Sequence, residues 1–200
     1  MRSKAGDYAP IIKRLASHGF VVVGLSTSPG DGSKATQLLN WIAQKTDSPV
    51  SGKIDTDIVG CSGHSKGGLE CEKAIVTDKR IKTTILNNSG AFDKNGMAQC
   101  PADKPIAIVF GNNGMERPNA EGDYANSGVK APACLIMMDG ADHGHGSGPW
   151  DGMAATIAWF RWHLGGEDFR KADFVGSSGK YINEKIIGKQ GNWKGECKNF

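Results

Sequence analysis

The chain has 200 residues, of which 38% are hydrophobic and 22% charged, and its formal net charge is +3. This length suits a single domain, residues 1–200, large enough to bury about 70% of its unfolded surface without metals or disulfides. The basic residues form no clustered stripe, and no apolar run approaches the ~18 residues of a membrane span. We therefore expect a soluble globular protein with no nucleic-acid partner and no membrane span.

The cysteines limit the metal chemistry and leave the compartment open. The chain has five, without C-x-x-C spacing, which argues against a zinc site: Cys61, Cys71, Cys100, Cys134 and Cys197. Cys61 and Cys134 lie in strand-like runs and are interpreted as buried small hydrophobes. Cys100 and Cys197 lie in polar segments, where one option is a disulfide between them. No apolar stretch follows the opening "MRSKAGDYAP", so we expect no signal peptide in these residues.

The first elements in chain order are a helix, a strand and a second helix. Residues 8–18 place apolar side chains on one helical face, and Gly19 follows as a helix stop. The run "FVVVGLS" at 20–26 is too apolar to be half solvated, which predicts a strand covered on both faces. A turn then leads into a predicted helix at 33–45.

The remaining elements continue the alternation. A strand at 55–61 precedes a helix at 66–76, and a late helix over 153–164 has apolar residues at helical spacing. Three further strands are predicted at 82–88, 105–111 and 133–139, and a polar tail at 165–200 is expected to wrap the surface. This pattern predicts an α/β fold: a mostly parallel sheet of about five strands with helices on both faces.

The segment "GCSGHSKGG" at 60–68 holds the first candidate functional residue. A predicted strand precedes it and a predicted helix follows, the context that holds a nucleophilic serine on a tight turn, so Ser65 is the candidate nucleophile. The backbone N–H of Lys66 is the expected oxyanion donor, because the helix N-terminus stabilises developing negative charge. The alternative is a phosphate-binding turn, but neither G-x-x-x-x-G-K-[ST] nor G-x-G-x-x-G fits these residues.

A nucleophilic serine needs a base, and the loop "DGADHGHGSGPW" after the last predicted central strand offers two histidines. His143 is our candidate base because the order serine, acid, histidine places it just past a strand end. His145 would then line the site. The two histidines have no third ligand of comparable quality nearby, so we expect no metal site, and His64 is expected to support the turn instead of reacting.

The acid of the triad is the least determined residue. It should follow the strand at 105–111, where "GNNGMERPNAEGD" offers Glu116, Glu121 and Asp123. A second place is the loop after the preceding strand, which offers Asp93. The acid only orients and charge-stabilises the imidazole, so its chain position is more forgiving than that of the serine. Glu116 is favoured, with Asp93 and Asp123 as alternatives.

The blocks "YAPIIKRLASHGFVVVGLSTS", "GKIDTDIVGCSGHSKGG" and "GADHGHGS" resemble the α/β-hydrolase superfamily. The nearest branch is that of esterases related to cutinase-like polyester hydrolases, dienelactone hydrolases and platelet-activating-factor acetylhydrolases. The resemblance, over residues 8–175, implies Ser65 as nucleophile, Lys66 as oxyanion donor and His143 as base. It also implies a small-molecule or polymeric ester substrate, no cofactor and an extracellular location.

Three departures from the family pattern bear on activity. The usual acid register falls on Gly114, and Lys66 stands where Gln or Met is usual. The family's strands before "YAP", which supply the second oxyanion donor, have no counterpart here. We therefore expect an N-terminally shortened α/β-hydrolase fold, or else direct pairing of the strands at 20–26 and 55–61.

Two functions from different classes follow from these residues. The first is a serine hydrolase that cleaves carboxylic esters through an acyl-enzyme on Ser65, with Met115 and Trp150 as candidate lining of an apolar acyl pocket. The second is a hydrolase-fold fragment or pseudoenzyme that acts as a binding module. A third option uses Lys66 as a clamp for phosphate esters. The geometry around Ser65 and His143 separates the first two.

Overall fold

The computed structural model describes residues 5–45, 47, 49–146, 152–187 and 191–200. Within them, one five-stranded sheet has the order β1-β2-β3-β4-β5. The strands are β1 (Val59–His64), β2 (Ile81–Asn87), β3 (Ile106–Gly111), β4 (Ala133–Met138) and β5 (Trp193–Lys198). The first four run parallel, whereas β5 is antiparallel to β4. The predicted mostly parallel sheet is confirmed.

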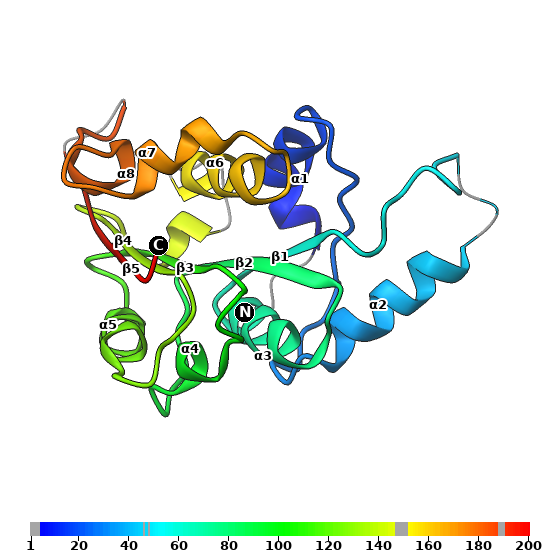
Figure 1. The fold of residues 1–200 in the computed structure, drawn as a ribbon, viewed down its shortest axis with the longest axis horizontal. Coiled ribbons are helices and arrows are strands. Elements are labelled where there is room, and N and C mark those ends of the chain that lie inside the picture. The colour runs from blue at the N-terminus through cyan, green and yellow to red at the C-terminus, as the bar shows by residue number, and fades with distance from the viewer. Residues whose placement is uncertain (1–4, 46, 48, 147–151, 188–190) are drawn as a thin grey trace.

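Helices cover both faces of this sheet, as expected (Figure 1). One face carries α1 (Ala9–Ala16), α6 (Gly152–His163), α7 (Lys171–Phe174) and α8 (Lys180–Asn183). The other carries α2 (Ser33–Gln44), α3 (Lys66–Thr77), α4 (Gly96–Gln99) and α5 (Arg117–Ala125). Three 3-10 helices are η1 (Ala5–Tyr8), η2 (His143–Gly146) and η3 (Asp168–Arg170). Among the described residues, no helix is long and apolar enough to span a membrane.

The hydrophobic core lies in two layers, one on each face of the sheet. Ile85 and Val109 pack on the α1 and α6 side, whereas Leu86 and Phe110, their neighbours in the chain, pack on the α3 and α5 side. Successive strand residues point to opposite faces, so the central strands are buried on both and read as continuous apolar runs. This double burial is why their predicted ranges agree closely with the structure.

The predicted strand at 20–26 is wrong. These residues form no strand, and Val21 and Val23 are 51% and 42% exposed. Among the described residues, the edge strand β1 pairs only with β2, so the alternative of direct pairing between 20–26 and 55–61 is wrong as well. An apolar run becomes a strand only where a neighbour completes its backbone hydrogen bonds, and none of the described residues does so here.

The tail at 165–200 does more than wrap the surface. It supplies β5 to the sheet, and it buries Phe174, Tyr181 and Trp193 in the core beside α6. These apolar residues are sparse in a polar segment, and an edge strand with one solvated face carries a weak apolar signal. The sequence pattern therefore missed a strand that seals one edge of the sheet.

Two disulfides correct the predictions made for the cysteines. Cys61 of β1 is bonded to Cys71 of α3, and Cys134 is bonded to Cys197, its direct partner in the β4–β5 register. Cys61 and Cys134 are therefore not free thiols, and the suggested bond between Cys100 and Cys197 is wrong. Cys100 is free and buried, and burial raises the pKa of its thiol to about 12.

Removing either disulfide is expected to destabilise the protein by an amount that follows the length of the closed loop. The chain-entropy relation gives about 3 kcal/mol for Cys61–Cys71, separated by 10 residues, and about 4 kcal/mol for Cys134–Cys197, separated by 63. Urea unfolding of the two double Cys→Ala variants measures both losses. The reverse order of losses would contradict a stabilisation that acts through the unfolded chain.

Helix α3 carries two buried glutamates in opposite situations. Glu70 accepts hydrogen bonds from the backbone N–H groups of Gly30 and Lys34, both at 2.8 Å, and more weakly from Asp31 and Ala35. It therefore caps α2, whose own N-cap residue is a glycine. Glu70 thus fixes the loop at 28–35 against the start of α3.

Glu72 has no comparable set of donors. It is fully buried and neither carboxyl oxygen has a hydrogen-bond donor among the described residues. Burial, followed by the neighbouring Asp123 carboxyl, raises the pKa of Glu72 to about 10. Glu72 is therefore protonated at neutral pH and is able to donate its proton to Asp123, which accepts N–H bonds from Ala91 and Met97.

The buried Glu72 beside Asp123 predicts that the stability of the protein falls as the pH rises. The folded pKa of Glu72 is raised, so its contribution is complete below pH 4.5 and is lost as the pH rises towards 10, by up to about 1.4 kcal/mol per pH unit. We expect Glu72→Gln to flatten the decline in unfolding free energy between pH 5 and 9. Glu70→Gln, which breaks satisfied bonds, should cost about 2 kcal/mol throughout. Chemical denaturation across this range measures both, and a parallel decline in wild type and Glu72→Gln would contradict the assignment.

Candidate active site

Ser65 lies on a strained turn between β1 and α3, at the carboxyl end of the parallel strands. Its φ of 56° and ψ of −122° are sparsely populated by residues other than glycine, and its N–H is held by the carbonyl of Asn87 at 2.9 Å. A Cβ on Gly63 would lie 2.1 Å from the carbonyl oxygen of Gly67. The crossing of strand and helix therefore requires glycine at 63.

The first turn of α3 fixes the other side of this turn. The carbonyl of Ser65 accepts the N–H groups of Gly68 at 2.9 Å and Leu69 at 3.4 Å. A Cβ on Gly68 would lie 2.3 Å from the Cβ of Ser89, whereas one on Gly67 would meet open space. Close packing thus requires glycine at 63 and 68, whereas position 67 has room for a side chain.

His143 and Glu116 meet at the same edge of the sheet. His143 opens η2 after β4, and its Nδ1 lies 2.7 Å from Oε2 of Glu116 at the start of α5. Glu116 is only 6% exposed, and a Cβ on Gly114 would lie 2.2 Å from its Oε1. The Glu116 carboxylate therefore occupies the space that a side chain at 114 would fill. With Nδ1–H donating to this carboxylate, Nε2 is the nitrogen available to accept a proton.

Asn88 holds the His143 loop in place, and the sequence analysis did not single it out. It is fully buried with a φ of 46°, and its Nδ2 donates to the carbonyls of Asp142 (3.1 Å) and His143 (2.8 Å). Its Oδ1 accepts the N–H of Gly111 at the end of β3. One side chain thus joins the ends of three neighbouring strands. The only sequence signal for it is an asparagine directly after a buried strand.

His64, which was expected to support its own turn, in fact contacts the His143 loop, and its contacts define its tautomer. Its Nε2 lies 2.8 Å from the His143 carbonyl, which can only accept, so Nε2 carries the proton. Its Nδ1 then accepts from the hydroxyl of Tyr8 at 2.9 Å. Burial, above all, lowers the pKa of His64. A neutral His64 therefore links η1, the end of β1 and the His143 loop.

The other candidate carboxylates are engaged elsewhere. Asp123 is buried and accepts the N–H groups of Ala91 and Met97. Asp93 caps its own turn through the N–H of Asn95, and Glu121 pairs with Arg117 on the surface. Within the described part of the chain, Glu116 alone among these four forms a hydrogen bond to His143.

The side chain of Lys66 extends along the neighbouring loop. It is exposed, and a Cβ on Gly30 would lie 3.4 Å from its Cγ and 3.5 Å from its Cε. Ser28 in the same loop donates to the Lys66 carbonyl at 3.3 Å. The aliphatic part of Lys66 thus packs against the segment that Glu70 anchors.

The described structure has no hydrogen bond between Ser65 and His143, and the nearest contact recorded between their segments is made by His64. His64, the residue before Ser65, has its ring centroid 4.7 Å from that of His143. Met115 is 82% exposed beside Glu116. Trp150 and the side chain of His145 lie outside the described residues. In the described ranges, no group of three or more His, Cys, Asp or Glu residues could hold a metal ion.

The sheet, its helices on both faces and the sequence together define a protein of the α/β-hydrolase type. Residues 4–192 match the family described as PETase, PET hydrolase-like. The chain therefore belongs to the PET hydrolase-like family, and the resemblance inferred from the sequence is confirmed. Membership of this family supports a hydrolase.

A further similarity covers less of the chain. Over 142 residues, the chain is 31% identical to the carbamoyl phosphate synthase small chain of Methanosarcina mazei. This alignment takes in 64% of the present chain and 38% of that protein. A match to such a limited part of a longer protein does not define a family for this chain.

Proposed function

We propose that this protein is a serine hydrolase that cleaves carboxylic esters through an acyl-enzyme on Ser65. The observation that carries the proposal is the 2.7 Å contact between His143 and the buried Glu116 at the sheet edge where Ser65 occupies its strained turn. A histidine oriented by a carboxylate, at the same sheet edge as a serine at a helix start, is the arrangement of acyl-transfer enzymes.

In this mechanism the Ser65 hydroxyl attacks the ester carbonyl while His143 Nε2 takes its proton. Glu116 holds the imidazole in the required tautomer and stabilises the imidazolium that forms. The N–H of Lys66 and the positive end of α3 face the developing oxyanion. His143 then donates the proton to the departing alcohol, and water releases the acyl group by the same steps in reverse.

The acid is displaced by two residues from the family register at Gly114. Because the Glu116 carboxylate lies over Gly114, an aspartate at 114 would compete for the same volume. The longer Glu116 side chain thus substitutes for an acid at 114. This displacement supports Glu116 over Asp93 and Asp123 as the triad acid.

The substrate class is a small-molecule or polymeric ester, and polyester is the class that the family description names. The exposed Met115 next to Glu116 supports an apolar acyl or chain segment at the site. Two disulfides favour an oxidising compartment, which agrees with the extracellular location that the family resemblance implies.

A second candidate function is a hydrolase-fold binding protein without catalysis. It is favoured by one observation: the described structure has no hydrogen bond between Ser65 and His143. Catalytic hydrogen bonds are often long in unliganded enzymes and tighten in the substrate complex, so this observation alone does not outweigh the His143–Glu116 contact.

Labelling separates these two functions. Wild type should react covalently with a fluorophosphonate probe at Ser65 and turn over p-nitrophenyl butyrate. Ser65→Ala should lose both, whereas Ser89→Ala, a matched change of a neighbouring buried serine, should retain them. Intact mass spectrometry and absorbance measure the two outcomes. If wild type neither labels nor turns over, the binding protein is the correct assignment, and if Ser65→Ala still labels, Ser65 is not the nucleophile.

The position of the acid is tested by moving it. Glu116→Gln should lower kcat by up to about 10⁴, as the loss of the orienting carboxylate does in other triads. The double variant Gly114→Asp/Glu116→Ala should recover at least about a tenfold part of that loss, because it places a carboxylate in the same volume. Steady-state kinetics with Glu121→Gln as control measures this, and an unaffected Glu116→Gln would remove Glu116 from the mechanism.

A further inference from the structure

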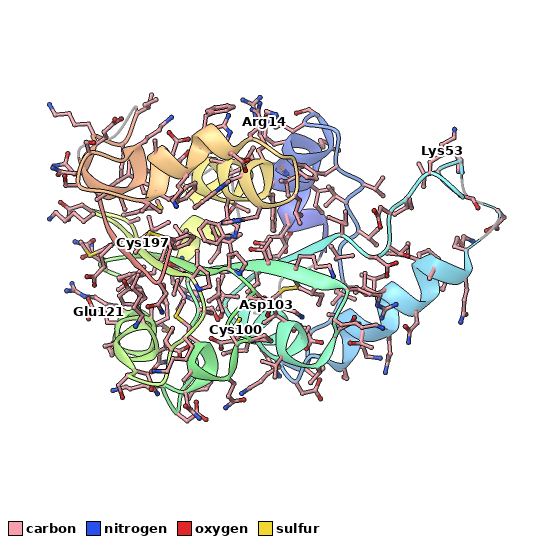
Figure 2. All side chains as sticks on the ribbon, in the orientation of Figure 1. Arg14, Lys53, Cys100, Asp103, Glu121 and Cys197 are labelled. Atoms are coloured by element: carbon pink, nitrogen blue, oxygen red, sulfur yellow. A yellow bond between two sulfur atoms is a disulfide. The ribbon has the colours of Figure 1, made fainter. Side chains whose placement is uncertain are left out.

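A groove of about 600 Å³ lies on the α1 and α6 side of the sheet, apart from Ser65, Glu116 and His143. Helices α1, α6 and α8 and the end of η3 form its walls, and Arg14 on α1 is labelled there in Figure 2. Basic side chains and an apolar stripe along α6 make up most of its lining. None of the lining residues has a role in the proposed ester hydrolysis.

The charged side chains of this lining are all basic. Four are permanent cations that come from four different elements, together with one histidine: Arg14, Arg161, Arg170, Lys180 and His18. Two carboxylates form ion pairs with two of these cations. Glu167 lies 2.5 Å from both Arg161 and Arg170, and Asp173 lies 3.1 Å from Arg170. The salt bridges hold these two guanidinium groups in fixed positions.

The other two cations of the groove form no ion pair in the described ranges. Within the described ranges, neither Arg14 nor Lys180 has a carboxylate within 4 Å, and Lys180 instead lies 5.7 Å from the ring centre of Tyr181. Partial burial, followed by Arg161, Arg14 and Arg170, lowers the pKa of His18. Three guanidinium groups thus act on one point of the groove, and four cations face two carboxylates.

The rest of the lining is apolar. Met153, Ala154, Ile157 and Ala158 form a stripe along α6 that ends one turn before Arg161, and Pro10 faces it from α1. From Met153 to Arg161 the helix rises about 12 Å. The apolar part of this span, from Met153 to Ala158, is about 7.5 Å long, so a chain along it that reaches Arg161 would cover the full rise. The three arginines all act on His18 and therefore gather towards that end of the groove.

We propose that this groove binds a small amphiphilic anion, with an apolar chain or ring along α6 and one carboxylate, sulfate or phosphate headgroup at the arginines. Guanidinium groups suit such headgroups because their fork of donors matches oxyanion geometry. The apolar stripe contributes through the area it removes from water. A single headgroup beside Arg14 would offset the charge of a guanidinium that has no carboxylate within 4 Å in the described ranges.

Titration calorimetry with decanoate below its micelle concentration tests this proposal. We expect saturable binding at one site, and at least tenfold weaker binding of acetate, which lacks the chain, and of decyltrimethylammonium, which reverses the charge. Arg14→Glu should weaken decanoate binding at least about tenfold, since the reversal places a negative charge beside the headgroup.

Lys13→Glu is the matched control, because Lys13 is exposed on the same helix and does not line the groove. It should change the decanoate affinity less than twofold. Ala154→Glu, at a second exposed lining position, should weaken binding as Arg14→Glu does and keeps the test open if that variant fails to fold.

Three outcomes would overturn the proposal. If Arg14→Glu and Lys13→Glu lose the same affinity for decanoate, the effect would come from the net charge of the protein and not from the groove. Binding of decyltrimethylammonium as strong as that of decanoate would remove the role of the arginines. Arg14-dependent sedimentation with phosphatidylglycerol vesicles, without binding of free decanoate, would assign the face to a membrane surface instead.

Discussion

The close crossing of β1 and α3 at Gly63 is the constraint on which the candidate site depends. With only 2.1 Å between the position of a Cβ at 63 and the Gly67 carbonyl oxygen, the chain has room for no side chain there. The turn this crossing imposes gives Ser65 its positive φ and its place at the helix start. The Cys61–Cys71 disulfide spans the same turn, so the strained conformation is held covalently as well as by packing.

The rest of the site follows from the direction of the strands. Because β1 to β4 run parallel, the loops that follow them meet at one edge of the sheet. Asn88 fixes these loops relative to one another, because its side-chain amide forms hydrogen bonds with Asp142, His143 and Gly111. His64 adds a second link through the His143 carbonyl. The position of His143 is therefore set by backbone contacts, and with Nδ1 on the Glu116 carboxylate its Nε2 remains available for chemistry.

Features that depend on local pattern were predictable, and features that depend on pairing were not. Residues 82–88, 105–111 and 133–139 are apolar on both faces, and the strands formed there. Residues 20–26 carry the same signal but have no neighbouring strand in the described part of the chain. Trp193–Lys198 carry a weak signal but pair with β4. Chain order was enough to nominate Ser65, His143 and Glu116. The disulfides and the contacts of Asn88 and Tyr8 join residues far apart in sequence, for which spacing gives no signal.

If Glu116 is the acid, as proposed, the site keeps a carboxylate on His143 although position 114 is a glycine. A side chain at 114 and the carboxylate of Glu116 exclude each other, since Cβ and Oε1 would lie 2.2 Å apart. The buried position of the Glu116 carboxylate therefore requires glycine at 114. Position 114 alone would suggest that the acid is missing, whereas the Glu116 carboxylate lies against His143.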